Sequence, residues 1–336
     1  MSGDARSMAH GLLVADGLAW QNLYRRSRLL APWTRRLRRE IEAEHEVHGI
    51  LDEALPFALN QPTAPFLSGP GANAEWLAFQ LGILRAGDGR YDRRVALDAW
   101  RDLGRRRDAI RLTVGQHAAL ANLEAGATPP VSGHDNPHYF DDAACFRSVA
   151  FLLVRDGDLA AHVRSDAEIS NALDGIWAAV AFATALAAAL DGDDARTAIA
   201  RGRQAVPDDT WLALELRRSL ASAGRAGSLF ALIDALGDDA VNHAYDYGNS
   251  APETLAIAFA IVHYAGGAFE PSLLAALALP KTRASVAPMV GALCGALGTT
   301  GPSGLGDPAP LRGVALPHLA GVRPLALVDE VVAGST

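Results

Sequence analysis

The chain has 336 residues, half of them hydrophobic, and a formal net charge of -8 at pH 7. This length is enough to bury a large core, and the mildly acidic balance gives no electrostatic reason to expect nucleic acid as a partner. The longest uncharged run, 176–190, is dominated by alanine and is shorter than the about 20 residues that a bilayer span needs, so we expect no membrane partner.

Helical periodicity runs through nearly the whole chain. Apolar residues recur at spacings of three and four, and no set of alternating β-branched runs predicts a sheet. The predicted helical segments lie near 12–29, 41–55, 76–84, 95–103, 110–125, 141–155, 167–190, 193–204, 209–223, 251–265, 270–279 and 284–298. Because the segments are short and no linker separates them, we expect one compact, orthogonal all-α domain over residues 1–336.

The amino-terminal part contains two charged clusters. No apolar core typical of a signal peptide precedes Asp16, so a cytoplasmic location is expected. Seven arginines lie between Arg25 and Arg39. They could form a phosphate or nucleic-acid patch or a subunit contact, but the acidic balance elsewhere favours a solvated helical face. In segment 42–48 the two histidines are three residues apart, not four as in a zinc-peptidase helix, so we expect a surface charge cluster.

The densest polar and aromatic stretch, 132–142, comes directly before an apolar helix. It contains His134, Asp135 and Asn136 and ends with Asp141 and Asp142. Backbone N–H groups at the start of that helix would suit an anion such as pyrophosphate, although the two acids would compete with it. The alternative is that these acids only cap the helix. Both interpretations stay open.

A second polar and aromatic stretch, 243–250, precedes the predicted helix 251–265. Tyr245, Tyr247 and Asn249 would suit stacking on an adenine or a sugar, and a packed loop with anchored tyrosine hydroxyls is an equally ordinary alternative. Ser250 is a plausible N-cap, with Glu253 at capping-box spacing. The residues alone contain no nucleophile elbow, phosphate loop or dinucleotide fingerprint.

The order of these segments resembles the ADP-ribosylglycohydrolase family over nearly the whole chain. Helix 286–296 is close to the family's V-A-A-I-x-G-A-x-x-G-A pattern, and segment 141–147, which ends in Arg147, is similar to its G-N-G-A-A-M-R helix start. The other matching segments are 11–19, 129–133, 166–190 and 250–278. The resemblance implies a compact, orthogonal, multi-helix all-α domain of this family's type.

The same resemblance implies a pair of magnesium ions, held between a T-D-D-T turn and a D-x-D-T turn. Here the two turns read Ala72-Asn73-Ala74-Glu75 and Thr282-Arg283-Ala284-Ser285, so four aspartates are replaced. Mg²⁺ requires hard oxygen ligands, usually with carboxylates among them. Because Asn73, Thr282 and Ser285 offer only neutral oxygens, we expect no metal and no other cofactor.

The chemistry implied by the family is cleavage of an N- or O-glycosidic bond of ADP-ribose, which needs an acid for the leaving group and an oriented water. Four carboxylates fall where the resemblance implies a cleft and are the catalytic candidates: Asp16, Glu75, Asp142 and Asp166. A carboxylate enclosed by aromatic side chains such as Trp76 could have a raised pKa. The candidates for ligand binding are Asn73, Trp76, His134, Asp135, Asn136, Asp141, Arg147, Tyr245, Tyr247, Asn249, Thr282 and Ser285.

Three functions remain open. The first, which we favour because Glu75 and Asp16 remain, is a magnesium-independent glycoside hydrolase acting on an ADP-ribosyl, NAD-derived or nucleoside-like small molecule. Under it, carboxylates converge in the cleft and Glu75→Gln abolishes turnover. The second is a catalytically inactive protein that binds ADP-ribose or a related nucleotide. The third is a structural or interaction protein with a filled cleft.

Overall fold

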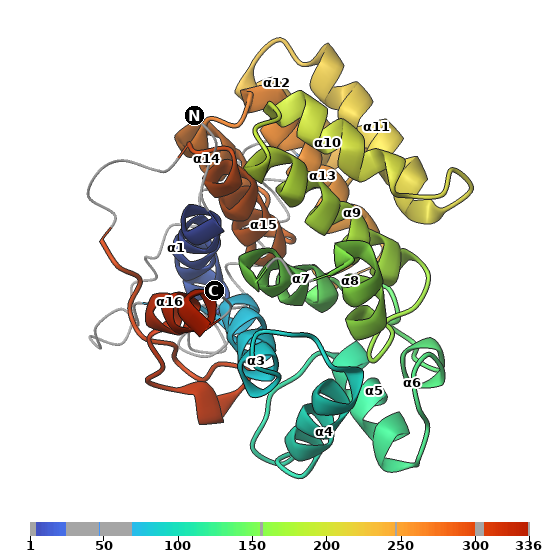
Figure 1. Cartoon of the computed structure of the whole chain (residues 1–336). Coiled ribbons are helices and arrows are strands. Elements are labelled where there is room, and N and C mark those ends of the chain that lie inside the picture. Colours follow the sequence, from blue (N-terminus) through green and yellow to red (C-terminus); the bar gives the residue numbers. More distant parts are fainter. Residues whose placement is uncertain are drawn as a thin grey trace, which may run out of the picture.

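The computed structural model describes residues 5–24, 47, 69–154, 157–245, 247–299 and 306–334, with the side chains of 20–24 left out. The arginines between Arg25 and Arg39 therefore lie outside the described residues, as does segment 42–48 apart from Val47. The described residues form α-helices and contain no strand, which confirms the all-α prediction (Figure 1). None of their helices is both long and apolar enough to cross a membrane.

The helices follow one another with short connections. In chain order they are α1 (Ala5–Tyr24), α3 (Ala72–Ala86), α4 (Arg93–Gly104), α5 (Val114–Glu124), α6 (Val131–His134), α7 (Ala143–Val154), α8 (Leu159–Ala167), α9 (Asp174–Leu190), α10 (Ala195–Gln204), α11 (Trp211–Arg225), α12 (Leu229–Asp239), α13 (Ala251–Ala265), α14 (Phe269–Leu277), α15 (Arg283–Ala296) and α16 (Pro324–Gly334), with a short 3-10 turn, η2, at Pro317–Leu319.

Most predicted segments within the described residues correspond to helices, but four helices were not predicted: the short α6, α8, α12 and α16. The predicted segment 167–190 begins after a helix we did not expect, α8, which starts where Asp158 accepts a hydrogen bond from the amide of Ala161. The chain then turns, with Leu173 at a φ of 46°, before α9 begins. We also did not predict α12 and α16, which are only 11 residues long each.

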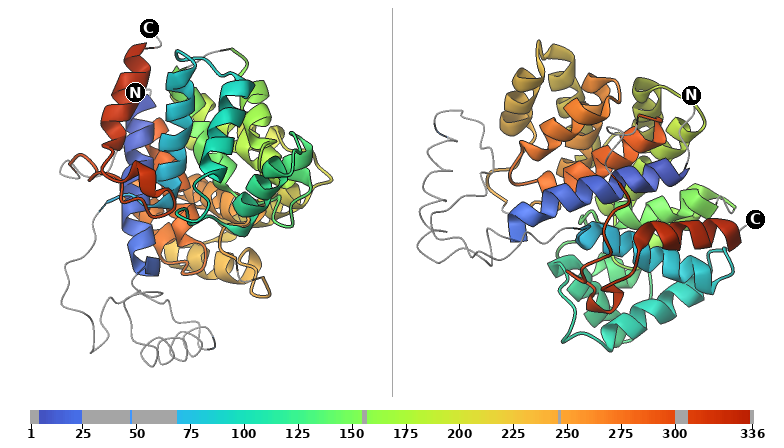
Figure 2. Two further views of the ribbon diagram at one scale, coloured as in Figure 1. Left: turned by 90° about the horizontal axis from the view of Figure 1, so that it is seen from below. Right: turned by 90° about the vertical axis from the view of Figure 1, so that its left-hand side faces the viewer.

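Helices α1 and α15 approach each other so closely that their contact requires glycine. A Cβ atom on Gly11 would overlap the carbonyl oxygen of Gly291, and one on Gly291 would overlap that of Gly11. Gly295 faces the backbone of Ser7 in the same way. Because only glycine allows two backbones to approach so closely, these residues fix the relative position of the two helices. Figure 2 shows α1 running along α15 in the right-hand view.

The carboxyl-terminal residues 306–334 pack against the amino-terminal helices. Helix α16 lies beside α1 and α3 and carries two exposed ion pairs to them, Arg6–Asp329 at 2.9 Å and Arg85–Glu330 at 3.2 Å (Figure 2). Exposed pairs of this kind contribute little to stability, typically below about 1 kcal/mol. The firmer attachment of this segment is through Glu75, described below.

Candidate functional site

Four helix N-termini meet at one place in the molecule, those of α3, α7, α13 and α15. The Nδ2 atom of Asn73, on α3, donates a 2.7 Å hydrogen bond to the carbonyl oxygen of Ala284, on α15. Ser285, also on α15, donates to the carboxylate of Asp142, just before α7. The amide of Asp142 in turn donates to the carbonyl oxygen of Asn249, 3.0 Å away and just before α13. The two turns that resemble metal-binding turns are therefore in direct contact.

Asp16 enters this cluster from α1 and is completely buried. Its Oδ2 accepts hydrogen bonds from the amides of Gly71 at 2.7 Å and Ala74 at 3.1 Å, and its Oδ1 lies 3.4 Å from Nδ2 of Asn73. Asp16 thus caps α3, whose own N-cap residue, Gly71, has no side chain for the purpose. Burial raises the pKa of Asp16 to about 7, against the lowering effect of these hydrogen bonds.

Asp142 is the second buried acid of the cluster. Its Oδ2 accepts a 2.9 Å hydrogen bond from the hydroxyl of Thr254, in the first turn of α13, and it also accepts from Ser285. Burial raises the pKa of Asp142 well above its ordinary value, and the neighbouring charge of Asp141 raises it further. A carboxyl group with this environment takes up a proton more readily than an exposed one.

Asp141 has a different role, because it caps α7. Its Oδ1 accepts from the amide of Ala143 at 2.8 Å, while its Oδ2 accepts from the hydroxyl of Thr113 at 2.5 Å and from Nδ2 of Asn249 at 3.2 Å. Burial raises the pKa of Asp141, and its hydrogen bonds oppose this. Of the two interpretations left open for this residue, the geometry supports helix capping.

Glu75 does not join the cluster. Its two carboxylate oxygens accept hydrogen bonds from the amides of three consecutive residues, Val314 at 2.5 Å, Ala315 at 2.8 Å and Leu316 at 2.7 Å. Burial raises the pKa of Glu75, and these three amides oppose the shift. The carboxylate therefore anchors the carboxyl-terminal segment to α3, and the catalytic role that we expected for Glu75 has no support in this geometry.

Asp166 and Arg147 form an ion pair inside the protein. The distance from Nε of Arg147 to Oδ2 of Asp166 is 2.7 Å, and Nη2 of Arg147 donates to the hydroxyl of Ser170 at 3.0 Å. The guanidinium lies over the rings of Trp76 and Trp100, which are themselves stacked. Arg147, Asp166 and both tryptophan side chains are buried. This geometry supports a role in the core, and neither the catalytic role that we expected for Asp166 nor the ligand-binding role that we expected for Arg147 and Trp76.

The remaining candidates of stretch 132–142 separate into two groups. His134 and Asp135 are exposed at the end of α6. Asn136 is buried, and its Nδ2 donates to the carbonyl oxygens of Gly115 and Ser170, both at 2.9 Å. Asn136 thus fastens the loop to its neighbours and does not face solvent.

The aromatic residues of the two polar stretches come together at the rim of the cluster. The hydroxyl of Tyr245 lies 2.9 Å from Nε2 of His138, and the ring of Tyr247 meets His138 edge-on with 4.5 Å between centroids. Phe140 packs against both His138 and Tyr245. Tyr247 is 45% exposed, so this rim is open to solvent.

Several residues of the site were not among our candidates. Thr254 and Thr113 hold the two neighbouring aspartates, and His138 is the centre of the aromatic rim. His138 lies within stretch 132–142, which we singled out, and its partners Tyr245 and Tyr247 were candidates, but His138 itself was not. Thr282 and Ser285 are at the cluster as expected, and the hydroxyl of Thr282 is buried with no hydrogen-bond partner among the described residues.

The side chains present do not suit a pair of magnesium ions. At the contact between the two turns, Asn73 presents an N–H donor, which repels a cation, and it is already bonded to Ala284. Among the described residues, no three His, Cys, Asp or Glu side chains are grouped so as to hold a metal. We therefore derive no chemical step through a metal.

Comparison with known proteins agrees with this arrangement of segments. Residues 6–302 match the family described as ADP-ribosylglycohydrolase. A solved structure described as an "ADP-ribosylglycohydrolase-related protein complex" is similar over 99% of this chain and 98% of that one, with a TM-score of 0.55 and 20% sequence identity. At this identity the likeness concerns the fold alone. No match was found among the curated proteins.

Proposed function

Since the chain belongs to the ADP-ribosylglycohydrolase family, we propose that it binds an ADP-ribosyl or related nucleotide ligand without hydrolysing it by a magnesium-dependent route. The observation that carries this proposal is the hydrogen bond from Asn73 to the carbonyl oxygen of Ala284. It joins the two turns directly, where the resemblance implies carboxylates and cations between them. Under this proposal, the contact leaves no side chains to hold a metal ion that would orient a ribose and a water.

The state of the carboxylates supports the same conclusion. Asp16 caps α3, Asp141 caps α7, and Glu75 holds the backbone of 314–316. A general base must reach a water or a substrate proton, and these groups are buried and already accept hydrogen bonds. Under this proposal, none of these three carboxylates is free to act as the general base of the family chemistry.

Ligand binding is supported by the aromatic rim, which is open to solvent at Tyr247. Rings such as those of Tyr245 and Tyr247 suit stacking against a planar base. Both stretches that we singled out in the sequence contribute to this surface.

A second candidate function is magnesium-independent hydrolysis of the same glycosides. The raised pKa of Asp142 favours it, because such a carboxyl group keeps its proton to a higher pH than an ordinary one and can donate it to a leaving group. In that reaction water would attack the anomeric carbon, the glycosidic bond would break, and the proton of Asp142 would go to the leaving nitrogen or oxygen. The proton lost by the attacking water would then restore the carboxyl group of Asp142.

Calorimetric titration of the protein with ADP-ribose, combined with an assay for release of ADP-ribose from ADP-ribosylated peptide and of nicotinamide from NAD, tests both functions. We expect binding that is the same in EDTA and in magnesium, with no product. Product formation that Asp142→Asn abolishes would establish the second function instead. Absence of any binding would refute the proposal, and binding that requires magnesium would refute its metal-independent part.

Variants of the rim show whether the ligand binds there. Removal of one stacking ring, in Tyr245→Ala or Tyr247→Ala, is expected to weaken binding about 5- to 30-fold, in line with stacking contributions of about 1–2 kcal/mol. Phe230→Ala is the matched control, because Phe230 is a 70% exposed aromatic residue on α12. It should leave binding unchanged.

A further inference from the structure

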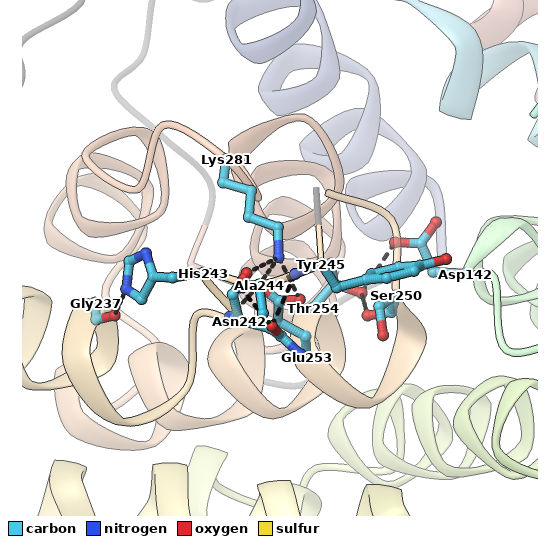
Figure 3. Close-up of polar contacts among 10 residues, drawn as sticks. All are labelled: Asp142, Gly237, Asn242, His243, Ala244, Tyr245, Ser250, Glu253, Thr254 and Lys281. Atoms are coloured by element: carbon cyan, nitrogen blue, oxygen red, sulfur yellow. Dashed lines mark hydrogen bonds and ion pairs between the residues drawn. The ribbon is translucent and has the colours of Figure 1, made fainter. Parts of the chain in front are cut away.

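Lys281, the only lysine in the chain, has three oxygen atoms around its amino group. Its Nζ lies 2.9 Å from each carboxylate oxygen of Glu253 and 2.7 Å from the backbone carbonyl oxygen of Asn242 (Figure 3). The Glu253 side chain is only 2% exposed, and that of Lys281 is 19% exposed. An ammonium group has three N–H donors, so Lys281 is fully used by these partners.

Asn242 is held through its backbone amide, its backbone carbonyl oxygen and its side-chain oxygen. Its amide donates to Oε1 of Glu253 at 3.1 Å, and its carbonyl oxygen accepts from Lys281. Its side-chain oxygen accepts from the amides of Ala244 and Tyr245, both at 3.0 Å. The side-chain bonds form a local turn that sets the direction in which the chain reaches Tyr245.

At the other end of the same loop, Gly248 contacts the backbone of Lys281. A Cβ atom on Gly248 would overlap the carbonyl oxygen of Lys281, so the two backbones are in close contact. The next residue, Asn249, donates to Asp141 and accepts from the amide of Asp142. We call residues 242–245 and 247–249 the clamped loop.

The ion pair sits next to the residues that hold Asp142. Glu253 is followed directly by Thr254, whose hydroxyl donates to Asp142 (Figure 3). Ser250 occupies the N-cap position of α13 but makes no capping hydrogen bond, so Glu253 is not part of the capping box that its spacing suggests. Its carboxylate serves the clamped loop instead. Burial raises the pKa of Glu253, and Lys281 opposes this.

We infer that Lys281 and Glu253 are positioning residues, whose ion pair fixes the clamped loop so that Tyr245 reaches His138 and Asn249 reaches Asp141. The inference rests on the proposed function for the ligand that this rim binds, a planar base carried by an ADP-ribosyl group. Neither residue touches that ligand. They act by holding its binding surface in one conformation before the ligand arrives, which lowers the cost of ordering the loop on binding.

The test compares wild type with Lys281→Met and Lys281→Arg. In Lys281→Met the buried Glu253 loses its cation, so we expect amide hydrogen exchange at Ala244 and Tyr245 to accelerate at least ~10-fold and the Kd for ADP-ribose to rise by a similar factor. Lys281→Arg should recover part of both effects, because it keeps the charge with a different geometry. Arg85→Met, which removes an exposed ion pair elsewhere, is the control and should change neither.

A charge exchange, Lys281→Glu combined with Glu253→Lys, tests whether the ion pair acts through its hydrogen bonds to Asn242 or only through the attraction between its two charges. It restores a pair of opposite charges but places an ammonium against the amide of Asn242 and a carboxylate against its carbonyl oxygen. We expect no recovery of slow amide exchange. Recovery to the wild-type rate, or wild-type exchange in Lys281→Met, would overturn the inference.

Two measurements keep the inference separate from the proposed function. Amide exchange is measured without ligand, so a wild type that fails to bind ADP-ribose refutes the function but leaves the clamp to be decided by exchange. If the variants do not fold, the acylation rate of the single lysine in the wild-type chain tests whether Lys281 is engaged in the native state. We expect acylation of Lys281 to be at least ~10-fold slower in the native than in the urea-unfolded chain, and equal rates would contradict the clamp.

Discussion

Asn73 and Ala284, 211 residues apart in sequence, are joined by a 2.7 Å hydrogen bond from the side-chain amide of the first to the carbonyl oxygen of the second. This bond connects the start of α3 to the start of α15. It also brings the Asn73 amide within 3.4 Å of the buried carboxylate of Asp16. The N–H donors of Asn73 therefore stabilise a contact that an acidic residue at the same position would weaken.

Asn73→Asp should lower the free energy of unfolding by roughly 2–4 kcal/mol at pH 8, because it removes the donor to Ala284 and adds a negative charge beside Asp16. The loss should be smaller at pH 5, where the introduced carboxyl group can hold a proton and donate again. Chemical denaturation of wild type and variant at both pH values measures this. Asn73→Ala, which removes the donor without adding charge, should cost about 1–2 kcal/mol at either pH.

Magnesium adds a second readout to the same variant. A single new carboxylate does not make a binuclear site, so millimolar Mg²⁺ should leave the melting temperatures of wild type and Asn73→Asp unchanged. A rise of several degrees in the wild type would show that these residues hold a cation, against the proposed function.

Glu75→Gln should loosen residues 306–334 and leave ligand binding unaffected. The glutamine keeps one acceptor oxygen but turns an NH₂ group toward amides that are themselves donors, those of 314–316. We expect a loss of about 2–4 kcal/mol in the free energy of unfolding and faster proteolysis within 306–334. Glu330→Gln removes only an exposed ion pair of the same segment and should change stability by less than about 1 kcal/mol.

If Glu75→Gln instead abolished product release without changing stability, the anchoring role would be wrong. That outcome is what the hydrolase hypothesis predicted from the sequence. The two results are readily distinguished, because one appears in the unfolding curve and the other in the turnover assay.

The helical fold could be predicted because its signals are local. Apolar residues at spacings of three and four mark each helix, and the glycines at Gly11 and Gly291 belong to the segments that carry the family resemblance. The pairing of stretches 132–142 and 243–250 could not be predicted in the same way. Each stretch was singled out by composition, but their contact depends on tertiary structure, which brings the residues just before α7 against those just before α13.

The roles of charged residues were the hardest to predict. Nothing near Glu75 in sequence shows that its hydrogen-bond donors come from 239 to 241 residues away. From the sequence we predicted that Arg147 binds a ligand, whereas in the structure it pairs with Asp166 and lies over two tryptophan rings. Whether an ionisable residue is buried and paired depends on distant segments, and local sequence carries little of that information.

Asp16→Asn should change how stability depends on pH. The pKa of Asp16 is raised from its ordinary 3.8 to about 7 in the native chain. Between these values the native state binds more protons than the unfolded state, so this residue makes wild type lose stability as pH rises from about 4 to 7, with no further change above. Asparagine cannot ionise, so the variant lacks this component.

The measurement is the difference in free energy of unfolding between wild type and Asp16→Asn at pH 4, 5.5, 7 and 8. We expect the difference to shift against wild type by up to about 4 kcal/mol across the series, since each pKa unit corresponds to about 1.4 kcal/mol. Parallel profiles for the two proteins would show that Asp16 titrates normally.

Gly291→Ala should separate α1 from α15 and thereby disturb the site from a distance. The new Cβ would overlap the carbonyl oxygen of Gly11 and approach the side chain of Ala15, so one helix has to move. We expect a loss of at least about 2 kcal/mol in the free energy of unfolding. Because Asp16 lies on α1 and Ser285 on α15, amide exchange at the start of α3, which Asp16 caps, should accelerate as well.

Gly82→Ala is the matched control for this prediction. Gly82 lies inside α3, and a Cβ atom there has no other atom within 4 Å. Alanine is favoured over glycine in a helix by about 1 kcal/mol, so this variant should be equally stable or slightly more stable than wild type. The same intrinsic gain acts at position 291, and opposite signs for the two substitutions therefore isolate the cost of the helix crossing. If both variants were stabilised, the close approach of α1 and α15 at Gly11 and Gly291 would be refuted, and with it the way in which Asp16 is brought to the four helix N-termini.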